Sequence, residues 1–192
     1  MIHLKEYLYE RVKKEIDLWD EKDIYAISFF IYSNEAFTYN EFSNITEFSI
    51  SYNTEKDCSG ADINSEERWN YAFWRQNEIN ITDSEGQKVL FQWYKENGID
   101  NIGYEDRSNS YDANYKYIGK GPVGYYELLT VVSDVANKLQ NENYIVNKFG
   151  KPLPIIIHDL EYSWYVIEAT KNANPKGEAN QFIEVMRALG NI

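Results

Sequence analysis

Apolar residues recur every three or four positions near the start of the chain, which is the period of an α-helix. These positions are Leu4, Leu8, Val12, Ile16 and Trp19, with polar residues between them. The pattern predicts an amphipathic helix over roughly 2–19 that packs on a sheet. The same period returns over Val123–Gln140 and Gly177–Leu189, and a further helix is expected over Tyr162–Lys171.

Three segments have the periodicity or the composition of β-strands. Ile24–Tyr32 is apolar on both faces, which is typical of a strand in the middle of a covered sheet. Thr46–Tyr52 alternates apolar and polar residues and is expected to pair with it as an antiparallel neighbour. The run Pro154–Leu160 predicts a third strand. An irregular arm is expected at Phe37–Phe42.

Two shorter helices are predicted from residues that favour helix starts. Asn64 with Glu67 three residues later is typical of an N-cap. Ser84 with Gln87 forms a second pair of this kind, and Asn97-Gly98 is expected to end that helix. The first of the two helices would carry four aromatic residues, Trp69, Tyr71, Phe73 and Trp74.

The order of helices and strands is typical of the α+β class. We expect one domain over residues 1–192, with a mainly antiparallel sheet packed against several helices. The segment 99–121 is rich in tyrosine and is expected to be a loop region. It is interpreted either as a binding arm or as a plain insertion.

The charge of the chain limits its partners. The formal net charge is −12 and the isoelectric point is about 4.6. Nucleic acids and anionic membranes bind clusters of Lys and Arg, so neither is expected as a partner. An acidic protein instead attracts a basic partner protein, although ordinary solubility also explains such a charge. The 17 tyrosines suit interfaces, but an AT-rich genome would also produce them.

The cell compartment is predicted from the cysteine count and the apolar runs. The single Cys58 cannot form an internal disulfide, which fits a reducing cytoplasm. No apolar run approaches the ~20 residues of a membrane span, and the first residues lack the apolar core of a signal peptide. We therefore expect a soluble cytoplasmic protein.

His158, Asp159 and Glu161 form the main catalytic hypothesis, as a general base with an orienting carboxylate or as part of a metal site. Adjacent strand residues point to opposite faces, so His158 and Asp159 should not face each other. The only other histidine is His3, and no paired Cys/His spacing supplies further ligands, so no metal or cofactor is expected. The alternative is a buried His158 bonded to backbone, with Asp159 capping the helix at Tyr162.

The best local candidate for an interaction site is the segment that runs from Glu66 to Arg75, which mixes Trp, Arg and acidic residues. Trp and Arg dominate the binding energy of many interfaces. The alternative is an ordinary helix with Trp69 and Phe73 on its inward face and Arg68 stacked over an aromatic ring. With residues of the 99–121 region, the predicted partner-facing set is Glu66, Glu67, Trp69, Trp74, Tyr104, Glu105, Asp106 and Tyr111.

Several segments, in order along most of the chain, resemble a known family. They are Ile24–Phe29, Phe48–Glu55, Glu67–Trp74, Lys148–Tyr162 and Asn172–Pro175. The chain is similar in these segments to the bacterial domain-of-unknown-function family numbered 4303. That resemblance implies no catalytic residues, and similar small acidic bacterial proteins often act as immunity proteins beside toxins.

Three functions follow as hypotheses. The first is a cytoplasmic protein-binding module, an immunity or antitoxin-like inhibitor that masks a basic effector. The second is a hydrolase or metal-dependent enzyme that uses His158, Asp159 and Glu161. The third is a module that associates with itself through the 99–121 region; the sequence does not determine an oligomeric state.

Overall fold

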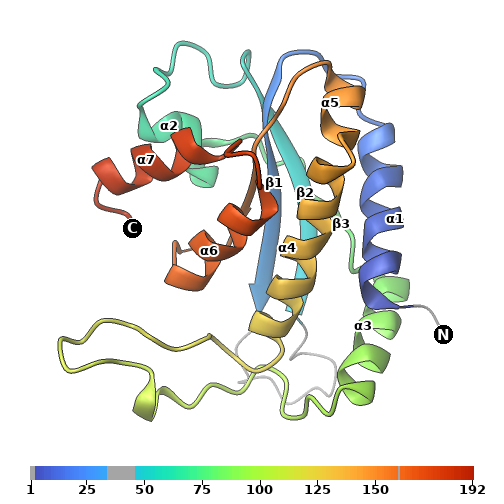
Figure 1. Ribbon diagram of the computed structural model, residues 1–192, viewed down its shortest axis with the longest axis vertical. Coiled ribbons are helices and arrows are strands. Elements are labelled where there is room, and N and C mark those ends of the chain that lie inside the picture. Colours follow the sequence, from blue (N-terminus) through green and yellow to red (C-terminus); the bar gives the residue numbers. More distant parts are fainter. Residues whose placement is uncertain (1–2, 34–45, 160) are drawn as a thin grey trace.

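One mixed sheet of four strands is surrounded by seven α-helices and two short 3-10 helices among the residues described (Figure 1). The computed structural model describes residues 3–33, 46–159 and 161–192, and the arm expected at Phe37–Phe42 lies outside them. The elements in chain order are α1 (Leu4–Asp17), β1 (Ile24–Ser33), β2 (Thr46–Thr54), α2 (Glu66–Trp69), η1 (Tyr71–Phe73), β3 (Ile79–Asn80), α3 (Ser84–Glu96), η2 (Arg107–Asn109), α4 (Tyr125–Asn141), α5 (Tyr144–Phe149), β4 (Ile155–His158), α6 (Trp164–Ala173) and α7 (Asn180–Ala188).

The strand order across the sheet is β3-β2-β1-β4. Strands β1 and β2 pair antiparallel, as expected, with Phe29 opposite Ile50. Strand β4 instead pairs parallel to β1, so the prediction of a mainly antiparallel sheet is corrected to a mixed sheet. The physical reason is the long connection through α3 and α4, which returns the chain to the end of the sheet where β1 begins.

The prediction that β1 is a central strand covered on both faces is confirmed. On one face, Ile27 and Phe29 belong to a large core cluster that includes residues of α1, α3 and α4. On the other face, Ala26 belongs to a smaller cluster with residues of α2 and α7. Helix α6 contributes to both, with Val166 in the first and Ile167 in the second. The two clusters therefore make a single α+β unit.

Several helix boundaries differ from the prediction. Helix α2 begins after Ser65 instead of Asn64 and ends at Trp69. The side chain of the next residue, Asn70, accepts a hydrogen bond from the backbone NH of Ala72 and so starts η1. Helix α3 is capped by Asp83 instead of Ser84, and Oδ1 of Asp83 accepts from two backbone NH groups of the first turn. Helix α5 was not predicted at all.

The parallel pairing of β1 and β4 places the C-terminal ends of both strands at the same edge of the sheet. Helix α4 begins at this edge at Gly124, whose φ of 88° requires glycine and whose carbonyl accepts from Tyr94 at 2.9 Å. The loop 99–121 extends beyond the same edge, in green and yellow in Figure 1. Among the described residues, no helix is both long and apolar enough to cross a membrane.

Candidate binding site

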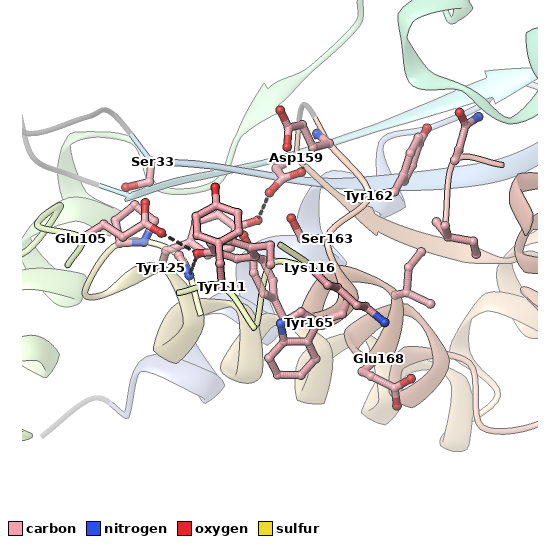
Figure 2. Close-up of a pocket in the computed structure, with 18 of the residues that line it drawn as sticks. Ser33, Glu105, Tyr111, Lys116, Tyr125, Asp159, Tyr162, Ser163, Tyr165 and Glu168 are labelled. Atoms are coloured by element: carbon pink, nitrogen blue, oxygen red, sulfur yellow. Dashed lines mark hydrogen bonds between the residues drawn. The ribbon is translucent and has the colours of Figure 1, made fainter. Parts of the chain in front are cut away.

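A cavity of about 1100 Å³ lies at the edge of the sheet where β1 and β4 end (Figure 2). Ser33 and Asp159 contribute to its wall from these strand ends, and the loop 105–122 and the first turn of α6 contribute most of the rest. Ligands of sheets with parallel strands commonly bind beyond the carboxyl ends of those strands. The cavity therefore occupies the part of the fold where a binding site is expected.

Asp159 is a half-buried carboxylate in the wall of this cavity. Its Oδ2 accepts a hydrogen bond of 2.7 Å from the hydroxyl of Tyr125, at the start of α4. Its Oδ1 accepts one of 2.7 Å from the backbone NH of Glu161. Burial raises the pKa of Asp159 above its ordinary value, because both hydrogen-bond donors are neutral and only partly offset the loss of hydration.

Aromatic rings form a continuous wall beside Asp159. The ring of Tyr165 lies edge-on to that of Tyr125, with 5.6 Å between centroids, and 5.6 Å from that of Trp164. The ring centroid of Tyr117 lies 6.4 Å from that of Tyr165 and 5.4 Å from that of Tyr111. The wall thus joins the loop 99–121 to the first turns of α4 and α6.

Hydrogen bonds hold the loop 99–121 in a defined conformation. The hydroxyl of Tyr117 donates to Glu105 at 2.5 Å and accepts from the backbone NH of Gly121 at 2.8 Å. The indole NH of Trp164 donates to the carbonyl of Gly119 at 2.9 Å. The loop is therefore fastened to the body of the protein beside the cavity.

His158 lies on the other face of the sheet from Asp159. Its ring is buried, with Nε2 2.5 Å from the hydroxyl of Ser28 and Nδ1 3.2 Å from the carbonyl oxygen of Asp159. Burial lowers the pKa of His158 to about 4. The prediction that the two side chains point to opposite faces is confirmed. Asp159 does not cap α6, because the residue that precedes this helix is Ser163.

The three residues of the catalytic hypothesis do not converge. The His158 ring packs against Tyr71 with 4.4 Å between centroids, whereas Asp159 and Glu161 line the cavity. Among the described residues, no group of three or more His, Cys, Asp or Glu side chains is arranged to hold a metal ion. A hydrolytic or metal site that combines these three residues has no geometric support.

Trp69 and Trp74 were predicted to face a partner, and the structure corrects this. Their exposed fractions are 5% and 4%, and both indole rings belong to the smaller core cluster. Each indole NH donates to a backbone carbonyl, that of Ile63 and that of Arg68 respectively. The sequence could not reveal this burial, because the cluster is completed by α7, more than a hundred residues away.

The alternative interpretation of this segment is confirmed in part. The Arg68 guanidinium lies over the ring of Tyr25 at 4.0 Å and forms two hydrogen bonds with Glu55, of 2.7 and 2.8 Å. Phe73 was expected to point inward but is 55% exposed. Glu66 is half-buried and accepts from Asn70, and Glu67 is exposed beside a smaller cavity.

The predicted residues of the loop region lie closer to the main cavity. Tyr104 and Tyr111 are 58% and 50% exposed, and Asp106 is exposed as the cap of η2. Glu105 and Tyr111 line the cavity. Tyr125, Trp164 and Tyr165 were not predicted as site residues, although the adjacent aromatic pairs Tyr125-Tyr126 and Trp164-Tyr165 at helix starts could have indicated them.

No protein-family model, curated protein or solved structure matches this chain significantly. The resemblance to family 4303 therefore stays a prediction.

Proposed function

We propose that this protein is a binding module that masks a basic partner protein, in the manner of an immunity protein or antitoxin. The observation that carries the proposal is a set of exposed apolar and aromatic side chains at one end of the molecule. We call this set the tyrosine face, and it consists of Tyr104, Tyr111, Tyr115, Ile118 and Trp164.

The tyrosine face has the composition of an interface. Tyr115 is 88% exposed, and aromatic side chains exposed to this extent are enriched where proteins bind one another. Four of the five residues belong to the loop 99–121, and Trp164 is bonded to that loop through Gly119. The loop is held by hydrogen bonds, so less conformational entropy is lost when a partner binds.

The net charge of −12 supports a basic partner. A negative field raises the rate at which a positively charged protein finds its binding surface. The single cysteine also agrees with action in the cytoplasm, where a toxin directed at cellular machinery would have to be neutralised.

The enzymatic alternative has weaker support. His158, its proposed base, has both ring nitrogens occupied by protein partners and is buried away from the cavity. A general base must reach the proton that it removes.

The proposal is tested by capturing partners with the tagged full-length chain from its native cell at low salt, followed by mass spectrometry. The captured protein is then produced separately, and its affinity is measured by surface plasmon resonance. We expect one stoichiometric basic partner. The double substitution Tyr111→Ser with Tyr115→Ser should weaken its binding by about a hundredfold, because exposed aromatic residues contribute most at interfaces.

The control is Phe73→Ser with Ile79→Ser, which removes two exposed apolar side chains outside the tyrosine face. It should bind the partner as the wild type does. Equal losses in both variants, or none in the first, would refute the tyrosine face as the binding surface.

A further inference from the structure

We propose that the cavity receives the side chain of an arginine of the partner, with Asp159 as its counter-ion and the tyrosine rings as its walls. This inference rests on the proposed function and specifies the chemistry that the cavity recognises.

The first observation is a carboxylate without a positive partner. Within residues 3–33, 46–159 and 161–192, no Lys, Arg or His nitrogen forms an ion pair with Asp159. A half-buried carboxylate that only neutral groups stabilise is costly for the folded protein. A cation that entered the cavity would offset that cost, because a carboxylate oxygen that accepts one hydrogen bond, as each oxygen of Asp159 does from Tyr125 or Glu161, can accept another.

The second observation is the aromatic wall. The rings of Tyr117, Tyr125 and Tyr165 meet edge to face, so that neighbouring rings present faces in different directions at the cavity. A guanidinium plane stacks on such faces and binds a carboxylate through two parallel NH groups. The protein already uses this combination elsewhere, where Arg68 lies over Tyr25 and forms two hydrogen bonds with Glu55.

The charges around the cavity favour a cation near its wall at Asp159. The other carboxylates are Glu105, Glu161 and Glu168, and the basic residues are Arg107, Lys116 and Arg187. All three basic residues are exposed, and Arg107 forms an ion pair with Glu105 at 3.0 Å. Asp159 is more buried than any of these basic groups. The charge at the inner end of a ligand that reaches Asp159 therefore faces a carboxylate, whereas the basic groups lie nearer the solvent.

The shape of the cavity favours arginine within a polypeptide over a free small cation. Its volume of about 1100 Å³ slightly exceeds the range of about 300–1,000 Å³ that is typical of small-molecule pockets. A single small cation or side chain would leave most of the cavity empty. An arginine together with the residues on either side of it in a polypeptide would fill a larger share of the cavity. The exposed residues of the tyrosine face continue the contact outside the cavity.

The experiment measures binding of short capped peptides to the full-length chain by isothermal titration calorimetry and by the intrinsic fluorescence of its five tryptophans, of which Trp164 lines the cavity. The probes are acetyl-Gly-Arg-Gly-amide, the lysine peptide, and the citrulline peptide, which has nearly the shape of arginine without its charge. We expect a dissociation constant of about 1 mM for arginine, as is reasonable for a single side chain. Lysine should bind several times more weakly, and citrulline at least about tenfold more weakly.

The variant Asp159→Asn should weaken binding of the arginine peptide at least about tenfold, because the ion pair between carboxylate and guanidinium is replaced by a contact between the guanidinium and a neutral amide. The control Asp20→Asn removes the same charge at an exposed position just before β1 begins, at the opposite end of the sheet, and should leave binding unchanged. Thermal unfolding of both variants tests that they are folded.

Two outcomes would overturn the inference without depending on any variant. They are the absence of binding of the arginine peptide to the wild type at about 10 mM, and equal binding of arginine and citrulline. Equal loss in Asp159→Asn and Asp20→Asn would also overturn it. These tests use no partner protein, so they can fail while the tyrosine face still binds its partner, and the two proposals are judged separately.

Discussion

The hydroxyl oxygen of Ser28 lies 2.5 Å from Nε2 of His158, across the parallel pair formed by β1 and β4. The carbonyl oxygen of Asp159, 3.2 Å from Nδ1, can only accept a hydrogen bond. Nδ1 therefore carries the proton, and Nε2 accepts from Ser28. Burial favours the neutral form of this ring, and in that form both ring nitrogens are satisfied by these two partners.

This relationship predicts that stability depends on pH through His158. Burial lowers its pKa from 6.5 to about 4, so the unfolded chain binds a proton below pH 6.5 while the folded state does not until the pH nears 4. Stability contributed by the neutral ring is present above pH 6.5 and is lost as the pH falls. We expect the free energy of unfolding, measured with urea, to fall by about 2 kcal/mol between pH 6.5 and pH 5 from this group.

His158→Gln should abolish this dependence, and the exposed His3→Gln should keep it. Asp159 has the opposite sign, because a raised pKa favours the folded state as the pH falls, so Asp159→Asn should steepen the loss on acidification. An unchanged slope in His158→Gln would contradict the assignment of a neutral buried ring.

A second prediction uses two adjacent aromatic residues with opposite environments. Trp74 is 4% exposed in the smaller core cluster, and Phe73 is 55% exposed. Trp74→Ala should lower the free energy of unfolding by about 3–5 kcal/mol, because it removes a large buried ring and leaves a cavity. Phe73→Ala should change it by less than about 0.5 kcal/mol. Urea denaturation measures both, and similar values for the two variants would contradict the burial described.

The sequence predicted the elements that its hydrophobic period marks clearly. Strand β1 was recognised as central because it is apolar on both faces, and α1 and α4 because their apolar residues recur at helical spacing. The parallel direction of β4 was missed, because a short apolar run has the same pattern in either direction. Helix α5 was missed because it is only six residues long.

The candidate site was predicted less well than the fold. Tyr111 and Glu105, predicted to face a partner because aromatic and acidic residues in a loop are typical of binding surfaces, line the cavity. Trp69 and Trp74 were misplaced because burial by α7 is a tertiary effect that no local pattern records. Asp159 was considered only as part of a catalytic or metal site, because its contact with Tyr125 joins residues 34 positions apart in the sequence and leaves no local pattern.

A third prediction tests how the loop 99–121 is held. A Cβ atom at Gly119 would lie 2.6 Å from the hydroxyl oxygen of Tyr117 and 2.9 Å from Oγ of Ser110. Gly119→Ala should therefore displace the Tyr117 ring and break its bonds to Glu105 and Gly121. We expect trypsin to cleave the loop at least about fivefold faster, because cleavage requires local opening.

Tyr117→Phe is the companion variant, since it keeps the ring but removes the hydroxyl, and it should produce a smaller increase in loop cleavage. Cleavage within α1 should be unchanged in both variants. A cleavage rate in Gly119→Ala equal to that of the wild type would show that the contacts of Tyr117 do not hold the loop.

The last prediction concerns the rate at which the partner binds. With a net charge of −12, association with a basic partner should be accelerated at low ionic strength and slowed as salt screens the field. We expect the association rate constant, measured by stopped-flow fluorescence, to fall at least about tenfold between 20 and 500 mM NaCl, with a smaller change in the dissociation rate constant.

Asp106→Asn removes an exposed charge of the loop and should lower the association rate at low salt only. Asp20→Asn, at the far end of the sheet, is the matched control and should have a smaller effect. An association rate that does not depend on salt would remove the electrostatic argument for a basic partner, while leaving the aromatic contacts of the tyrosine face to be tested by their own variants.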